Sequence, residues 1–168
     1  MTVNERCSGP RGRAGQVHRL LYIERLVMIE AYTAGFLDAD GTLCLGKSNG
    51  KQEEYSRTPI VELYNCDKGI LEYIQTNWGG NIRSRKPSNK NTNVSYQLKL
   101  SGDAALVLLN DIFPYMKHDK KKRRAKLIID NYKRLTPRNG FYTEKMKMEK
   151  IALINEVMSI TMRGAGAY

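Results

Sequence analysis

The sequence predicts an α+β domain in which a four-stranded antiparallel sheet is combined with helices. Two observations support this. An apolar run with small residues at helical spacing, residues 26–38, is followed by a segment that alternates polar and apolar residues with period two. Two strands, a helix and two more strands then follow in order, and helical periodicity returns toward the end. This αββαββα order occurs once, so one domain is expected over residues 26–160.

Composition restricts the partner and the compartment. The chain has 168 residues, and its 28 Lys and Arg against 17 Asp and Glu give a net charge of +11. Such an excess favours nucleic acid as partner. No apolar run approaches the ~18 residues of a membrane span, and no secretory signal is recognisable, so a location inside the cell or an organelle is expected. Cys7, Cys44 and Cys66 form no zinc pattern and are expected to be free thiols.

The first helix carries a face of small residues. It is expected to begin near His18 or Leu26, after a basic and partly flexible extension over residues 1–25. Ala31, Gly35 and Ala39 recur every four residues, and Ala34 lies beside them. Such a face lets a second helix approach closely. Glycine inside a helix costs roughly 1 kcal/mol relative to alanine, which suggests a packing reason for it.

The remaining elements follow from alternation, capping residues and breakers. Strands are expected over residues 42–48, 57–65, 81–86 and 93–100, because apolar and polar residues alternate there. Helices are expected over residues 67–78, 103–112, 120–135 and 143–161. Asp67 and Asp103 are candidate N-caps for the first two of these helices, and Pro114 ends the second. Residues 161–168 are expected to form a flexible tail.

Two acids and a glycine close the first helix. Asp38 and Asp40 lie where the helix dipole disfavours carboxylates, so a compensating cation is expected, and a hard divalent metal prefers oxygen ligands. A second interpretation makes residues 36–43 the end of a strand, which resembles the nucleophile motif of haloacid-dehalogenase-like phosphatases. Residues 31–35 lack the β-branched side chains of a buried strand, which argues against it. A third interpretation is a helix-to-turn junction with solvated acids.

Residues 33–41 resemble the LAGLIDADG motif of homing endonucleases, with Thr33 in place of the first leucine. The chain matches the plan of that family from about residue 27 to residue 157. The resemblance implies the αββαββα fold with a DNA-binding sheet and an intron-encoded homodimer. Such an enzyme would cleave both strands of a long, near-palindromic double-stranded DNA site by Mg²⁺-dependent phosphodiester hydrolysis, across the minor groove, and leave 3′-hydroxyl overhangs.

The resemblance also assigns roles at the motif. Asp40 is expected to bind the divalent metal and act in catalysis, with help from the peptide carbonyl of Ala39. Asp38 matches an acid whose role looks structural. A homodimer that packs its first helices together would bring two Asp40 side chains near the two scissile phosphates. The dimer interface is expected to include Ala31, Ala34, Gly35 and Asp38.

Two further catalytic positions follow from the same resemblance. If Ala125 matches the family's alanine, Lys121 falls at the active-site lysine. An ungapped match from Pro114 leaves this chain one residue too long, so Lys120 and Lys122 remain alternatives. Asn65 falls where many members carry a glutamine or asparagine near active-site water, and a strand-ending asparagine is the alternative. His118 is expected to be a surface residue.

DNA contacts are expected on the polar face of the sheet. Arg83 and Arg85 alternate on one strand and therefore share a face, and arginine is the commonest reader of guanine. Glu62 is a candidate acceptor for a cytosine amino group. The remaining expected contacts are Thr42, Cys44, Gly46, Ser48, Thr58, Ser95, Gln97 and Lys99. A merely solvated face would have the same pattern.

Two other functions fit the same fold. An RNA-binding intron maturase needs the basic surface but not Asp40, and a DNA-binding regulator that has lost cleavage needs no active site. Replacing Asp40 with asparagine would abolish cleavage and spare RNA splicing or repression. The presence of Asp40 together with a lysine cluster favours the nuclease.

Overall fold

The computed structural model describes residues 13–47, 53–85 and 94–161, and the side chains from residue 27 onward within those ranges. The elements follow in the order α1 (Arg13–Asp40), β1 (Thr42–Lys47), β2 (Arg57–Asn65), α2 (Lys68–Trp78), β3 (Asn81–Arg85), β4 (Ser95–Ser101), α3 (Asp103–Ile112), the 3₁₀ turn η1 (Phe113–Tyr115), α4 (Asp119–Asn131) and α5 (Glu144–Ser159). This order confirms the predicted α+β class and the αββαββα plan.

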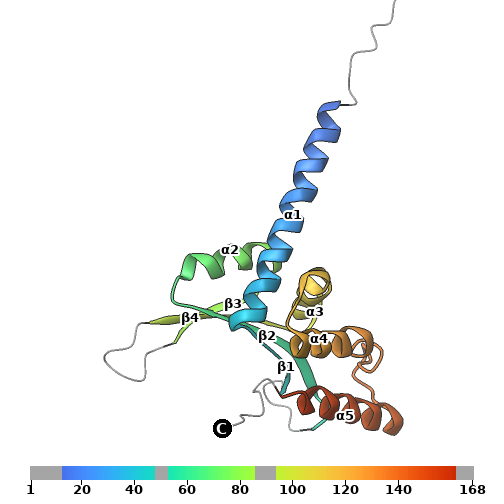
Figure 1. Ribbon diagram of the computed structural model, residues 1–168. Helices are drawn as coiled ribbons and strands as arrows, with labels where there is room; N and C mark the ends of the chain where they lie inside the picture. Colours follow the sequence, from blue (N-terminus) through green and yellow to red (C-terminus); the bar gives the residue numbers. More distant parts are fainter. Residues whose placement is uncertain (1–12, 48–52, 86–93, 162–168) are drawn as a thin grey trace, which may run out of the picture.

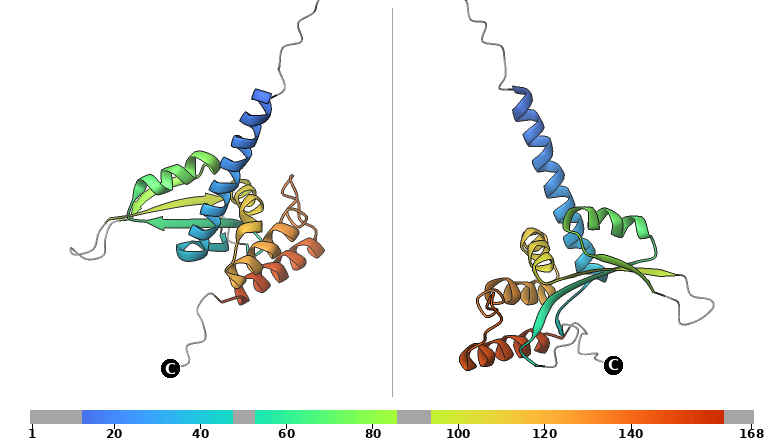
Figure 2. Two further views of the ribbon diagram at one scale, coloured as in Figure 1. Left: turned by 45° about the horizontal axis from the view of Figure 1, so that its top comes forward. Right: turned by 180° about the vertical axis from the view of Figure 1, so that it is seen from behind.

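The four strands form one antiparallel sheet in the order β1-β2-β4-β3. Its inner face is apolar and essentially inaccessible to solvent, and it carries Leu43, Leu45, Val61, Leu63, Leu98 and Leu100. Helices α1, α2 and α3 lie over this face, whereas α4 and α5 pack beside the edge strand β1 (Figures 1 and 2). The hydrophobic core therefore lies between the sheet and the helices, and it leaves the opposite face of the sheet for other contacts.

Helix α1 is longer than the sequence predicted. It begins at Arg13 instead of near His18 or Leu26, and its N-terminal part projects beyond the rest of the domain (Figure 1). Ile29 is the first of its described side chains to be buried, and Thr33 and Leu37 follow at a spacing of four. The helix thus packs on the core through its C-terminal half. None of the helices in the described ranges has the length and apolar character needed to cross a bilayer.

The junction between α1 and β1 requires a glycine. Gly41 is buried, and a Cβ atom added there would lie 2.4 Å from Leu37 Cδ1 and 2.8 Å from Leu37 Cα. The Gly41 N–H also donates to the Leu37 carbonyl at 3.0 Å. The chain can therefore pass directly from helix to strand, which fixes the last turn of α1 against the start of the sheet.

The helix caps agree with the sequence in part. Asp67 caps α2 as predicted, because its side chain accepts from the Gly69 N–H at 2.8 Å. The prediction for Asp103 was wrong. Gly102 is the N-cap of α3, in a left-handed conformation with φ of 63°, and Asp103 is the first helical residue. The tight turn from β4 into α3 needs positive φ at this position, which glycine adopts without strain.

The two last helices are shorter than predicted. Helix α4 ends at Asn131 instead of residue 135, and turns connect it to α5. Thr143 is the N-cap of α5, and its hydroxyl accepts from the Met146 N–H at 3.2 Å. Met158, an apolar residue near the end of this helix, is 45% exposed. Helix α5 therefore reaches the core mainly through Leu153, Ile154 and Val157.

Candidate active site and nucleic-acid interface

The C-terminal turn of α1 holds the candidate catalytic residues. Asp40 is the last residue of the helix and is exposed. Lys121, on α4, reaches this turn and donates from Nζ to the carbonyls of Leu37 and Asp38, both at 2.8 Å. Burial lowers the pKa of the Lys121 ammonium, and the Asp38 and Asp40 carboxylates partly oppose this shift. Lys121 and Asp38, 83 positions apart in sequence, thus lie in one charged cluster.

The Asp38 side chain connects the end of α1 to the segment before α4 through hydrogen bonds. Its Oδ2 atom accepts from the backbone N–H groups of Lys117 at 2.6 Å and His118 at 3.0 Å. Its Oδ1 atom is buried and has no hydrogen-bond partner among the described residues. Asp38 therefore makes structural contacts within its own chain, as the family resemblance implied. Its place in a dimer interface remains a prediction.

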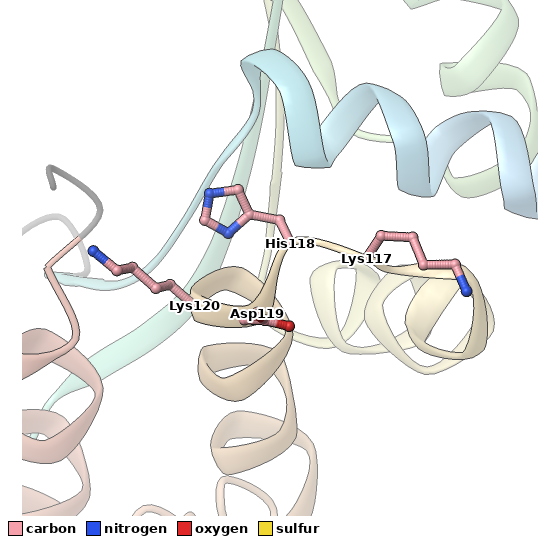
Figure 3. Close-up of a pocket in the computed structure, with 4 residues that line it drawn as sticks. All are labelled: Lys117, His118, Asp119 and Lys120. Atoms are coloured by element: carbon pink, nitrogen blue, oxygen red, sulfur yellow. The ribbon is translucent and has the colours of Figure 1, made fainter.

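The start of α4 lies directly beside this turn. His118 is the N-cap of α4, and its Nδ1 atom accepts from the Lys121 N–H at 3.4 Å. A surface hollow here is lined by Lys117, His118, Asp119 and Lys120. Lys117 extends to one side of it, and Lys120 and His118 extend to the other (Figure 3). His118 therefore helps to position Lys121 in addition to lying near the surface.

The three lysines that the sequence left as alternatives differ in their surroundings. Only Lys121 among them is buried, at 6% exposure, and bonded to the carbonyls that end α1. The Lys122 ammonium lies 5.4 Å from the centre of the Phe113 ring. The geometry therefore favours Lys121. Sequence reasoning missed Arg124, which lies one turn further along α4 and donates to the Leu43 carbonyl at 2.9 Å and to the Ile160 carbonyl.

The end of α1 has the donor types that a hard cation prefers. Carboxylates and helix-terminal carbonyls collect there, and the carbonyl of Ala39 belongs to the same turn. Within the described ranges, no group of three or more His, Cys, Asp or Glu side chains gathers in a metal-binding arrangement. The orphaned Asp38 oxygen and the exposed Asp40 carboxylate are the features that fit a divalent ion here.

Asn65 lies at the same end of the sheet as the motif. Thr42 pairs with Glu62 across β1 and β2, so β2 ends on the side of the sheet where α1 runs into β1. The Asn65 Oδ1 atom accepts from the Asp67 N–H at 2.7 Å. This bond gives Asn65 a part in the turn that leads into α2, and its catalytic role remains a prediction.

The small-residue face of α1 is open in the single chain. Ala31, Gly35 and Ala39 are exposed, and apart from its chain neighbours and the backbone of its own helix, no described atom lies within 4 Å of the position where a Cβ of Gly35 would stand. Ala34 is different, because it is fully buried in the chain's own core and cannot reach a partner. The expected interface is corrected accordingly. A periodicity of four correctly groups Ala31 with Gly35, whereas Ala34 lies about 100° from Gly35 around the helix axis.

The predicted DNA contacts share the outer face of the sheet. In the register, Thr42 lies opposite Glu62 and Glu62 opposite Lys99. The same face carries Cys44, Gly46, Thr58, Arg83, Arg85, Ser95 and Gln97. Burial raises the pKa of the Cys44 thiol, which keeps it neutral. Ser48 lies outside the described residues. A shared face is therefore confirmed, and DNA contact by its residues remains a prediction.

The outer face also contains residues that the sequence reasoning missed. Ile60 points outward but is only 8% exposed, and its Cδ1 atom occupies the space where a Cβ of Gly46 would stand. Tyr64 lies beside Gln97 in the register, and burial and a hydrogen bond to Glu62 raise its pKa to about 12. Alternation along β2 was the signal that would have placed Tyr64 with Glu62.

The fold matches that of known DNA-cleaving proteins. The homing endonuclease I-CvuI, crystallised with an I-CreI target and magnesium, matches 85% of this chain and 88% of its own, with 22% identity and a TM-score of 0.63. The archaeal intron-encoded homing endonuclease I-Vdi141I, complexed with DNA, matches 83% of this chain and 87% of its own, with 16% identity and a TM-score of 0.52.

A third match is a longer protein. The LAGLIDADG homing endonuclease I-GzeII, in complex with its DNA target, matches 83% of this chain but only 46% of its own, with 19% identity and a TM-score of 0.52. No protein-family model and no curated protein matches the chain. The chain therefore has the fold of the LAGLIDADG homing endonucleases.

Proposed function

We propose that this protein is a site-specific DNA endonuclease that acts as a homodimer on a long, near-palindromic double-stranded site. One observation carries the proposal. The exposed Asp40 carboxylate stands at the end of α1, between an open face of small residues and a polar sheet face. A second copy packed on the open face would bring a second Asp40 beside the first, and the sheet would hold the DNA across both.

The coverage of the matched proteins supports the homodimer. This chain spans 88% of the I-CvuI chain but 46% of the I-GzeII chain. It therefore corresponds to about half of the longer protein. Cutting both strands of a duplex requires two sets of catalytic groups, and a two-fold dimer supplies them with matching symmetry in the target.

The chemistry follows from the groups at the end of α1. A divalent ion, Mg²⁺ in our proposal, would be held by Asp40 and the Ala39 carbonyl, and when bound it supplies a Lewis acid for phosphodiester hydrolysis. Lys121 uses two of its three N–H donors on the carbonyls of Leu37 and Asp38. Its remaining donor and its charge would stabilise negative charge on the scissile phosphate. Asn65 would orient water.

We also propose an intron-encoded origin, with an RNA maturase as the alternative function. I-Vdi141I is intron-encoded, and we extend that origin to this chain by likeness of fold. An RNA maturase would use the same basic surface without the Asp40 carboxylate. The net charge of +11 suits either nucleic acid, and binding should weaken steeply with added salt in both cases.

The first test is a cleavage selection on a randomised plasmid library in magnesium. The wild-type chain is expected to yield cut products that share one long, near-palindromic site. Asp40→Asn should abolish cutting, because it removes the charge that holds the metal, and a chelator should do the same to the wild type. Asp130→Asn is the matched control, because Asp130 is an exposed α4 carboxylate paired with Lys126, and it should cut normally.

The outcomes separate the functions. Cutting by Asp40→Asn at the wild-type rate would refute the catalytic assignment. No cutting by the wild type, together with tight and structure-dependent binding of intron RNA, would replace the nuclease with the maturase.

A further inference from the structure

A hydrogen-bonded network on the outer face of the sheet is centred on Tyr64. The Tyr64 hydroxyl donates to Glu62 Oε2 at 2.7 Å and accepts from Gln97 Nε2 at 3.3 Å. The other Glu62 oxygen lies 3.4 Å from the Lys99 ammonium. The Arg85 guanidinium carbon lies 5.4 Å from the centre of the Tyr64 ring. Three strands, β2, β3 and β4, thus contribute to one connected group.

The network begins beside the candidate active site. Glu62 pairs with Thr42, which stands two residues after Asp40, and Lys99 pairs with Glu62 on the other side. Gln97 pairs with both Tyr64 and Arg83. The group therefore occupies the central strands β2 and β4 and the edge strand β3 of the surface that we assign to DNA.

The hydrogen bonds determine which groups remain available to a ligand. The two Glu62 oxygens already face donors from their own chain, Tyr64 and Lys99. The Lys99 ammonium has three N–H donors, of which Glu62 engages one, and the Arg85 guanidinium has five. This part of the face therefore offers mainly donors. In the major groove, guanine presents two acceptors, N7 and O6, and lysine and arginine are its commonest partners.

We propose that Tyr64 is a positioning residue for base recognition, which holds Glu62, Gln97 and Arg85 so that Lys99 and Arg85 select guanine in each half-site. The inference rests on the proposed function, since it assigns the sheet to DNA. In this arrangement Glu62 orients Lys99 instead of reading a cytosine, and Tyr64 itself contacts no base. The Tyr64 hydroxyl fixes the position of the Glu62 carboxylate, and the negative charge of that carboxylate holds the Lys99 ammonium in one orientation.

Tyr64→Phe is the sharpest test, because it removes only the hydroxyl and keeps the ring under Arg85. We would select binding sites from a randomised duplex library with two chains, one that retains Tyr64 and one with the Tyr64→Phe substitution, both carrying Asp40→Asn so that no cutting occurs. The chain that retains Tyr64 should enrich guanine at a symmetric pair of positions. In the Tyr64→Phe chain, the enrichment of guanine at these positions should fall about tenfold, as expected for one lost hydrogen bond. The base preferences at the other positions of the site should stay the same.

Tyr96→Phe is the matched control. Tyr96 lies on the neighbouring strand β4, and its side chain points to the inner face and packs against the core. The same chemical change on the opposite face should leave base preference unaltered. Thermal unfolding of the variants shows that each one is folded in the selection.

Three results would overturn the proposal. An unchanged base profile for Tyr64→Phe would mean that Tyr64 positions nothing. A uniform loss of binding at every target would make its role a general one in stability or phosphate contact. If neither chain selected any DNA sequence, the assignment of the sheet to DNA would itself fail. Because binding is read without cleavage, failure of the catalytic assignment alone would not alter the measurement.

Discussion

At the scale of single residues, the buried ammonium of Lys121 is the distinctive feature of the candidate active site at the end of α1. Lys121 is almost fully buried, and its ammonium bonds two carbonyls of the last turn of the helix, that of Asp38 and that of Leu37, which also accepts from the Gly41 N–H. The same cation lies within the field of Asp38 and Asp40. One side chain therefore ends a helix and supplies the positive charge beside the candidate metal ligand.

Lys121→Met should show both roles. Loss of the two bonds at the end of α1 should lower the free energy of unfolding by about 1–3 kcal/mol, measured by chemical denaturation. Cleavage under conditions where the variant is folded should also be lost. Lys122→Met is the matched control and should change stability by about 0.5 kcal/mol or less. If Lys122→Met lost cleavage and Lys121→Met retained it, the active-site lysine would be Lys122.

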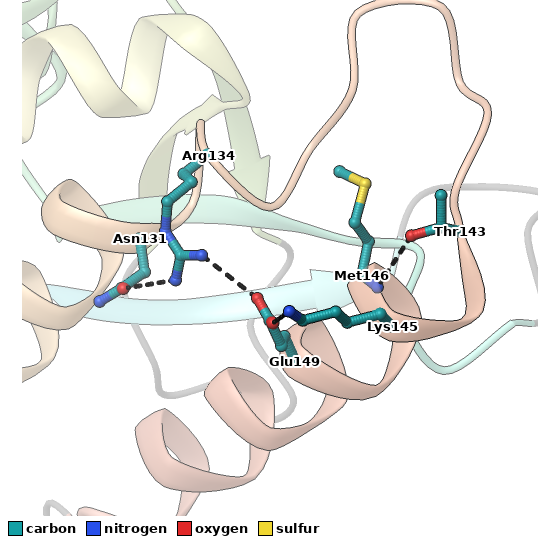
Figure 4. A network of polar contacts seen from close by, with 6 residues as sticks. All are labelled: Asn131, Arg134, Thr143, Lys145, Met146 and Glu149. Atoms are coloured by element: carbon teal, nitrogen blue, oxygen red, sulfur yellow. Dashed lines mark hydrogen bonds and ion pairs between the residues drawn. The ribbon is translucent and has the colours of Figure 1, made fainter.

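At the scale of elements, short-range caps and longer-range contacts together set the position of α5. The hydroxyl of Thr143 accepts from the Met146 N–H, and Arg134, from the turn after α4, bonds Glu149 on α5 (Figure 4). The Arg134–Glu149 pair is exposed, with side chains 62% and 37% accessible, so solvent screens it. The cap satisfies a helix-terminal N–H that has no partner within the helix.

The two contacts of α5 should therefore differ in their effect on stability. Thr143→Ala should lower the free energy of unfolding by about 1 kcal/mol, whereas Thr143→Ser should keep it, because the hydroxyl remains. Glu149→Gln should cost less, at most about 1 kcal/mol, and its effect should vanish at high salt. Chemical denaturation at two salt concentrations measures all three. Equal losses for Thr143→Ser and Thr143→Ala would rule out the cap as the cause.

At the scale of the whole molecule, two surfaces remain open in the single chain. The helices bury one face of the sheet and leave the other as the proposed DNA surface (Figures 1 and 2). Helix α1 packs on the core through one side and leaves Ala31, Gly35 and Ala39 exposed on another. In our proposal both are covered only in the complex of two chains with DNA. The active site is then complete only in the assembly.

Gly35→Leu tests the dimer directly. Nothing lies within 4 Å of the added Cβ in the single chain, so the fold should accept the leucine, and its helix propensity exceeds that of glycine. The same side chain should keep two α1 helices apart. Sedimentation at micromolar concentration with DNA should give a dimer for the wild type and a monomer for Gly35→Leu, with equal helix content by circular dichroism.

A control with the same bulk elsewhere completes this test. Ala152→Leu enlarges an exposed position on α5 and should leave the dimer intact. A dimeric Gly35→Leu chain would exclude the α1 face as the interface. A monomeric wild type with DNA present would exclude the homodimer.

The features of this protein that depend on local order were predictable from the sequence. Alternation placed the four strands and assigned the outer-face residues together, because side chains in a strand alternate regardless of what the sheet packs against. The Asp67 cap was predictable because donor and acceptor stand two residues apart. The small-residue face of α1 followed from helical spacing, and the motif at its end indicated the family resemblance.

Contacts between side chains of separate elements depend on how those elements pack. The bonds from Lys121 to Leu37, from the Lys117 backbone to Asp38 and from Arg124 to Leu43 join residues about 80 positions apart, and no local pattern specifies them. The burial of Ala34 and the exposure of Gly35 depend on where the sheet and α3 lie against α1. The Tyr64 network requires three strands in register. Periodicity predicts the face on which a residue lies, whereas its partner is fixed only when separate elements pack.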